Sequence, residues 1–164
     1  MSIRSDLMRL QRAAWANETV FFRPIETEDD LIYAAYDCRL RDDQTELVNP
    51  VWLSVGRAYL APEDHVPCVI CTAEGERVGF IDLYRWRGDT PSYSWGYFVE
   101  ARQQGRGYGK AAAELATRLL KTANGAMPIR LAVEEENRKA QAIYRGLGFR
   151  ALPERDGTDL VFSR

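Results

Sequence analysis

The amino-acid sequence predicts an α/β protein, α+β in some schemes, built on a mixed sheet that helices flank. Strand-like and helix-like segments follow one another in the order β-α-α-β-β-β-α-β-α-β-β, which is typical of this architecture. The chain has 164 residues, the usual size of one domain, and shows no internal repeat and no linker. A strand-like run at 93–99 leads through a glycine-rich turn into a strongly helix-forming run at 111–121.

The first part of the chain is expected to be mainly helical. Apolar side chains near helical spacing predict that 1–17 forms an amphipathic helix or extension, which precedes a single domain over 18–164. The elements expected here are a helix over 3–15, a strand over 19–24, a helix after the N-cap Thr27 and a helix over 51–60.

The remaining chain is expected to supply most of the sheet. Two of its strands flank Ala73-Glu74-Gly75-Glu76, which indicates a hairpin, and Asn124-Gly125 ends the helix that follows the glycine turn. The expected strands are 66–72, 77–86, 92–99, 129–133, 149–152 and 160–162, with helices over 111–121 and 138–145.

Composition and charge exclude several classes of function. Hydrophobic residues at 46% and charged residues at 28% describe an ordinary globular protein. A net charge of −2 argues against non-specific binding to nucleic acid, so no nucleic-acid partner is expected. The chain has no apolar run long enough to span a bilayer and no signal-peptide core, so we expect no membrane partner and a cytoplasmic location.

The cysteines and the single histidine predict neither a metal site nor a nucleophilic triad. Cys38, Cys68 and Cys71 form no even disulfide set, which suits a reducing compartment. Cys68 and Cys71 have CxxC spacing, but no second pair follows, and strand positions three apart point to opposite faces. His65 precedes Pro67 and is expected in a loop, with no serine or cysteine signature beside it.

The segment 99–110 combines the features of an anion-binding turn. Its glycines alternate with Arg106 and Tyr108 immediately before a helix. Glycines let the backbone approach an anion, and the N–H groups of the first helical turn point towards it. Arg102, Arg106 and Lys110 add positive charge at the same place. The same residues also fit a tight strand-to-helix turn with solvated basic side chains.

A second pattern follows the strand at 129–133. Asn137, Ala140 and Tyr144 are spaced by three and four residues, which brings them to nearly one face of a helix. Taken singly, Asn137 also fits a helix cap and Tyr144 a core aromatic residue.

The two patterns together resemble the GNAT superfamily of acyl-CoA-dependent N-acetyltransferases. The resemblance lies in Gln104-x-x-Gly107-x-Gly109 after a strand, then Asn137-x-x-Ala140-x-x-x-Tyr144, then Gly148-Phe149, and it covers about residues 19–163. It implies a mostly antiparallel central sheet of about six or seven strands, splayed between its two central strands. It also implies acetyl-CoA as cosubstrate, without a metal.

The resemblance implies which residues bind the cosubstrate. The turn and helix start would cradle the pyrophosphate of CoA, and the strand end would pair its backbone with the pantetheine arm. Tyr144 would protonate the departing thiolate, and a backbone N–H at the strand end would stabilise the oxyanion. The implied CoA-binding residues are Tyr97, Phe98, Val99, Gln104, Gly105, Arg106, Gly107, Tyr108, Gly109, Lys110, Asn137, Ala140 and Tyr144.

The general base is less clearly marked. An alkylamine with a pKa of about 10.4 is protonated at pH 7, so a base or a water relay must remove a proton before the amine attacks. Many relatives carry a glutamate in the strand before the turn, where this chain has Tyr93 and Ser94. The candidates for the base are Asp82, Glu100 and Tyr93. Asp82 alternates with apolar neighbours in a strand, so it also fits a solvent-facing position.

The acceptor is expected to be a polyamine or another small amine. Trp95 fits a bacterial branch of spermidine/spermine (diamine) acetyltransferases, although Gly96 stands where an arginine is common. Glu46, Asp64 and Asp82 suit a polycation but also fit ordinary surface positions. The stretches similar to that branch are 44–50, 54–62 and 78–84.

Other functions stay open. The acceptor could be a protein N-terminus, a lysine side chain or an aminoglycoside-like amine. A non-catalytic acyl-CoA-binding regulatory domain is a further alternative, which Tyr144 disfavours because binding alone needs no phenol beside the thioester. A homodimer is compatible with the amphipathic leader.

Overall fold

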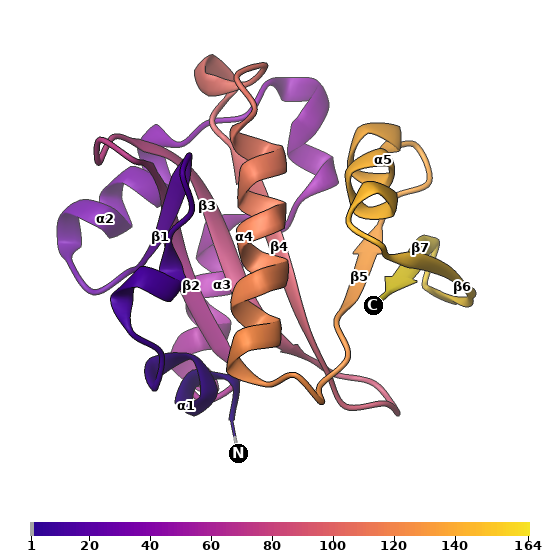
Figure 1. Ribbon diagram of the computed structural model, residues 1–164. Helices are drawn as coiled ribbons and strands as arrows, with labels where there is room; N and C mark the ends of the chain where they lie inside the picture. The colour runs from indigo at the N-terminus through magenta and orange to yellow at the C-terminus, as the bar shows by residue number, and fades with distance from the viewer. Residues whose placement is uncertain (1) are drawn as a thin grey trace.

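The computed structural model describes residues 2–164 as two β-sheets that diverge from a single point of contact (Figure 1). The first sheet is antiparallel with the order β1-β2-β3-β4, and the second has the order β5-β7-β6. The mixed, mostly antiparallel α/β architecture predicted from the sequence is confirmed. The strands are β1 (Val20–Pro24), β2 (His65–Thr72), β3 (Arg77–Trp86), β4 (Ser92–Val99), β5 (Arg130–Val133), β6 (Arg150–Asp156) and β7 (Asp159–Ser163).

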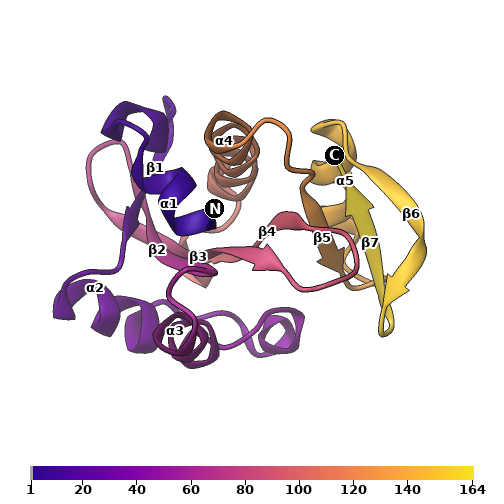
Figure 2. The same cartoon turned by 90° about the horizontal axis from the view of Figure 1, so that it is seen from below.

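Helices cover both faces of the first sheet. Figure 2 shows α1 and α4 on one face and α2 and α3 on the other, with α5 beside the second sheet. Within residues 2–164, no helix is long and apolar enough to cross a membrane. The helices are α1 (Ile3–Met8), α2 (Glu28–Ile32), α3 (Val51–Leu60), α4 (Tyr108–Ala123) and α5 (Arg138–Gly146); the shorter helical segments are η1 (Arg12–Trp15), η2 (Tyr33–Asp37), η3 (Asp42–Leu47) and η4 (Ala101–Gln103).

The core lies on both faces of the first sheet because helices cover its central strands on each side. The larger cluster joins the sheet to α1, α4 and the second sheet, and the smaller one lies under α2 and α3. Cys68 belongs to the larger cluster and Cys71 to the smaller, so the two thiols point to opposite faces as predicted. Over the described part of the chain, no group of histidine, cysteine and acidic residues is arranged to hold a metal ion.

The N-terminal helix is shorter than the predicted helix over 3–15. It ends at Met8, and a separate 3-10 turn begins at Arg12. Ser2 and Ser5 form a capping box at its start, since each side chain accepts a hydrogen bond from the backbone N–H of the other. Ile3 and Leu7 are fully buried, so this helix is packed into the larger core cluster.

Asp6 is a buried carboxylate that ties the N-terminal helix to the rest of the protein. It accepts hydrogen bonds from the Tyr93 hydroxyl, from the Asn124 side chain at 3.1 Å and from Arg9 at 2.7 Å. Burial by itself would raise the pKa of Asp6, but the bonds from Tyr93 and Asn124 and the charge of Arg9 outweigh it and hold the pKa below its usual value. The ionised carboxylate therefore stabilises the fold.

We expect Asp6→Asn to lower the free energy of unfolding at pH 7 by about 2–4 kcal/mol, because the amide cannot satisfy all three donors. The lowered pKa makes the contribution of Asp6 complete above the unfolded-state pKa near 3.9, and it is lost as the pH falls through the folded-state pKa. The difference between wild type and variant should therefore shrink towards pH ~3.

Urea unfolding at pH 7 and at acid pH measures this effect. The exposed Glu18 provides a matched control, because Glu18→Gln should change stability by less than about 0.5 kcal/mol. Equal stabilities of the Asp6 variant and wild type at pH 7 would contradict the assignment.

Candidate active site

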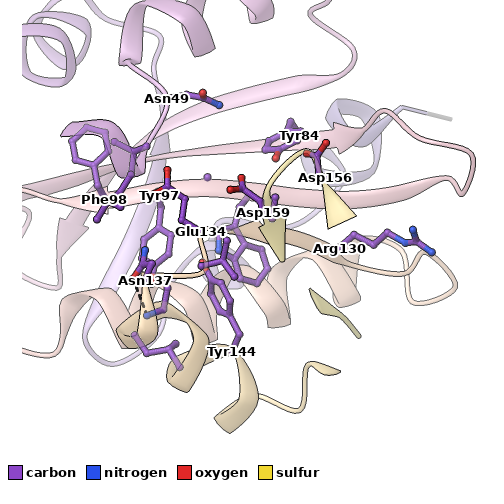
Figure 3. Close-up of a pocket in the computed structure, with 18 of the residues that line it drawn as sticks. Asn49, Tyr84, Tyr97, Phe98, Arg130, Glu134, Asn137, Tyr144, Asp156 and Asp159 are labelled. Atoms are coloured by element: carbon purple, nitrogen blue, oxygen red, sulfur yellow. Dashed lines mark hydrogen bonds between the residues drawn. The ribbon is translucent and has the colours of Figure 1, made fainter. Parts of the chain in front are cut away.

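A cleft of about 1570 Å³ lies where the two sheets separate. Its wall is formed by β4, the glycine turn before α4, the first turns of α5, the connection between η3 and α3, and the hairpin of β6 and β7 (Figure 3). Segments far apart in the sequence thus meet around one opening, and most of the predicted CoA-binding residues lie on its wall.

The edge of β4 that faces this cleft is unpaired. β4 touches the β5 segment at one parallel bridge on Tyr93, whose N–H donates to the Pro128 carbonyl at 2.9 Å. Backbone groups point to alternate sides along a strand, so those of Trp95, Tyr97 and Val99 point to the same side as those of Tyr93. Beyond the bridge they face the gap, which makes them available to an extended ligand.

The backbone of Phe98 points to β3 and away from the gap. The prediction that it bonds the pantetheine arm is therefore wrong. The N–H of Glu100 donates to the Val78 carbonyl of β3 at 2.8 Å, so the backbone of Phe98, two residues earlier, also points to β3. Phe98 lines the cleft with its side chain instead. Trp95, which the sequence did not mark as a cosubstrate contact, faces the gap, and its buried indole N–H has no hydrogen-bond partner in residues 2–164.

The glycine turn has the geometry of an anion site. Gly105 has φ of 80° and Gly107 has φ of 87°, which is the left-handed region that favours glycine. Gly107 is the N-cap of α4, and no side chain caps this helix. The N–H groups of Tyr108, Gly109 and Lys110 therefore lack intrahelical partners and point out of the helix end.

Side chains around the turn divide into those that line the cleft and those that do not. Lys110 and Gln104 line it, and the Gln104 amide also donates to the Val99 carbonyl at 3.0 Å, which fixes the turn against the end of β4. Arg106 is exposed and outside the lining. Arg102 turns away to pair with Glu100.

Tyr144 projects from α5 into the gap, across from Tyr97 on β4 (Figure 3). It is 6% exposed, and its ring meets the edge of Trp95 at 6.1 Å between centroids. Burial raises the pKa of the Tyr144 phenol well above its usual value, so the hydroxyl stays protonated and can donate. Asn137 is both a cleft residue and the cap of α5, since its side-chain oxygen accepts the Ala140 N–H at 3.2 Å.

None of the three predicted base candidates lines the cleft. The Tyr93 hydroxyl donates to Asp6 on the far face of the sheet. Glu100 is buried in a smaller cavity, where it accepts bonds from the Tyr33 hydroxyl at 3.1 Å and from Arg102. Both side chains are held by structural contacts, so the structure does not support a direct part for them in proton transfer.

Asp82 and His65 differ from their predicted environments. Asp82 is buried rather than solvent-facing, and it bonds His65 Nδ1 at 2.9 Å. His65 is the first residue of β2, not a loop residue, and its side chain lines the cleft. Pro67 misled the prediction: it lies one residue beyond the end of β1, where its carbonyl accepts from the Ile25 N–H at 2.9 Å and a missing ladder hydrogen bond is tolerated.

Three acidic side chains lie together on the cleft wall, at the end of β5 and on the hairpin of β6 and β7. They are Glu134, Asp156 and Asp159, and none of them makes an ion pair within residues 2–164. Burial, followed by repulsion from Asp156 and Glu136, raises the pKa of Asp159, and burial followed by repulsion from Asp159 raises that of Glu134. The sequence had marked other acids: Glu46 lines the cleft, whereas Asp64 lies outside it.

An extended strand edge, an uncapped helix start and a buried phenol on one cleft suit a thioester donor that carries a pyrophosphate. A model of the acetyltransferase (GNAT) family matches residues 30–149, which is most of the chain. The chain therefore belongs to this family, whose members use acetyl-CoA, and the resemblance found in the sequence is confirmed. It is an acyltransferase.

Solved structures agree on the fold. The acetyltransferase from Agrobacterium tumefaciens has a TM-score of 0.70 at 22% identity over 91% of this chain and 92% of that one. RimJ of Mycobacterium smegmatis, in complex with CoA-disulfide, scores 0.68 at 24% identity over 92% and 88%. The GNAT domain of S. lividans PAT scores 0.72 at 16% identity over 94% and 98%. Among curated proteins, none matches this sequence.

Proposed function

We propose that the protein transfers the acetyl group of acetyl-CoA directly to a primary amine of a polyamine or another small cationic amine. The observation that carries the acceptor class is the group of acidic side chains on the cleft wall. Glu134, Asp156 and Asp159 lie there without cationic partners. Their mutual repulsion would be relieved by a bound polycation.

The donor fits the glycine turn and the free edge of β4. The pyrophosphate binds at the start of α4, where the uncapped N–H groups and the helix dipole favour an anion and Lys110 adds charge. The pantetheine arm runs along the free edge of β4 and bonds the backbone of Tyr97 and Val99. This places the thioester between the strand edge and Tyr144.

Direct transfer suits these groups. The amine attacks the acetyl carbon, and a backbone N–H of the β4 edge stabilises the oxyanion of the tetrahedral intermediate. Collapse of the intermediate breaks the C–S bond, and the Tyr144 hydroxyl protonates the departing thiolate. No covalent enzyme intermediate is required, in keeping with the lack of a nucleophilic triad in the sequence.

A peptide N-terminus is the second candidate acceptor, and one surface feature favours it. Trp52, Tyr59 and Leu60 on α3 are largely exposed, and Leu60 also lines the cleft. Exposed aromatic side chains next to an active site can hold a peptide that enters it.

We expect Tyr144→Phe to bind acetyl-CoA normally but to lose turnover by about 100-fold or more, because only the proton donor is removed. Thiol release measures turnover, and the thermal shift caused by acetyl-CoA measures binding. Tyr36→Phe, at an exposed tyrosine outside the cleft lining, is the matched control and should keep wild-type turnover. Full activity of the Tyr144 variant would exclude it as the acid.

The acceptor proposal is tested by thiol release with acetyl-CoA and spermidine, spermine, N-terminal peptides or aminoglycosides. We expect the polyamines to give the highest kcat/KM. Asp159→Asn should raise the KM for spermidine by about tenfold, the effect of losing one charge-assisted contact. Glu114→Gln, at an exposed position on α4, is the control and should leave the KM unchanged.

The outcomes of this panel separate the alternatives. A preference for peptides would overturn the polyamine assignment and leave the transferase activity standing. Wild-type protein that binds acetyl-CoA but releases no thiol with any amine would favour the non-catalytic binding domain.

A further inference from the structure

His65 and Asp82 form a buried pair on the sheet face that carries α3. His65 in β2 pairs with Tyr84 in β3, and Asp82 lies two residues from Tyr84 on the same face. This diagonal brings His65 Nδ1 to 2.9 Å from Asp82 Oδ2. The Tyr84 ring stacks on the imidazole with centroids 5.7 Å apart and planes at 16°. The imidazole is thus held by the carboxylate and by the ring.

The contact with Asp82 determines which nitrogen of His65 is free. Because a carboxylate accepts, Nδ1 carries the proton of the neutral ring and Nε2 keeps a lone pair. Nε2 has no hydrogen-bond partner in the described part of the chain. His65 is 5% exposed and lines the cleft, whereas Asp82 does not. When the ring is neutral, the edge of the imidazole left to the cleft carries an unprotonated nitrogen.

The sheet face that carries the pair is open at the reacting strand. Asp82 pairs with Gly96 in β4, and a Cβ placed on Gly96 would meet no atom within 4 Å. Two buried polar atoms on this face, Asp82 Oδ1 and Ser94 Oγ, have no partner within residues 2–164. They are suited to hold a water molecule that relays a proton. Gly96 lies between Trp95 and Tyr97, whose backbones face the gap between the sheets.

Charged groups around the pair come from several elements. Arg4 of α1 donates to the His65 carbonyl at 3.1 Å, so its charge lies on the backbone side. The titratable and charged groups that face the pair or its stacked ring are Asp82 and Tyr84 of β3, Arg57 of α3 and Asp156 of β6. Cys68 of β2 interacts with Asp82 electrostatically from the opposite face of the sheet. Within this set, Asp82 is the group that contacts the imidazole by a hydrogen bond.

We propose that His65 is the general base of the transfer, and that Asp82 is its positioning residue. This rests on the proposed function. His65 Nε2 takes one proton from the acceptor ammonium, directly or through a water molecule, and the freed lone pair forms the new C–N bond. As the C–S bond breaks, Tyr144 protonates the sulfur, and the second amine proton returns to Tyr144 through solvent. The products are the amide, CoA as a thiol, and one proton that the imidazolium releases.

The test compares pH profiles of kcat/KM for wild type, His65→Gln and Asp82→Asn, with spermidine and each amine of the acceptor panel. Wild-type activity should fall on acidification as the imidazole becomes protonated. His65→Gln should lower kcat by about 100-fold or more, and its rate should keep rising with pH as free amine accumulates. Asp82→Asn should lower kcat less and displace the profile. Neither change should reduce the thermal shift by acetyl-CoA.

Two further measurements separate catalysis from structure. In His65→Ala, added imidazole should restore part of the lost turnover, which a purely structural histidine would not show. Glu114→Gln should keep the wild-type profile. An active wild type with an unchanged His65→Gln profile, or a His65→Ala defect that imidazole does not relieve, overturns the role of His65 alone. A wild type inactive with every amine overturns the proposed function as well.

Discussion

The single backbone bridge between β4 and the β5 segment is the constraint on which the site depends. At Tyr93 the two sheets are joined, and beyond it they separate. Buried backbone N–H and C=O groups require partners, so a strand that loses its neighbour must find another one. The Gln104 amide already satisfies the Val99 carbonyl. The remaining groups on this edge are left to the donor, and the separation of the sheets therefore creates its binding site.

The pKa values of acidic residues are shifted in opposite directions in the core and in the cleft. Asp6 and Asp30 are buried with several donors each, and the pKa of both is lowered because of these contacts. Burial and neighbouring carboxylates instead raise the pKa of Asp159 and Glu134. Acids that stabilise the fold are satisfied internally, whereas Asp159 and Glu134 make no ion pair within residues 2–164. Carboxyl groups with a raised pKa are typical of functional sites.

Local patterns in the sequence were enough to predict the glycine turn before α4 and the helix that brings Asn137 and Tyr144 to the cleft. The turn at 99–110 is marked by glycines at positions that need positive φ, and Asn137 and Tyr144 are marked by helical spacing. Both signals depend on neighbours in the chain. The opposite faces of Cys68 and Cys71 follow from the same kind of local alternation.

The acceptor half could not be predicted because it depends on contacts between distant segments. The pair of His65 and Asp82 requires the register of β2 against β3. Asp159 reaches the cleft only because the hairpin of β6 and β7 folds back on it. The direction in which the backbone of Phe98 points depends on the register of β4 against β3. No pattern within β4 reveals this register.

The most direct test of the account is amide hydrogen exchange with and without acetyl-CoA. The account predicts that acetyl-CoA slows exchange at the gap-facing amides of Tyr97 and Val99 and at the first-turn amides of Tyr108, Gly109 and Lys110. The amide of Phe98, already directed to β3, should change much less. Protection confined to the smaller cavity around Glu100, or an unchanged β4 edge in a protein that binds acetyl-CoA, would contradict it.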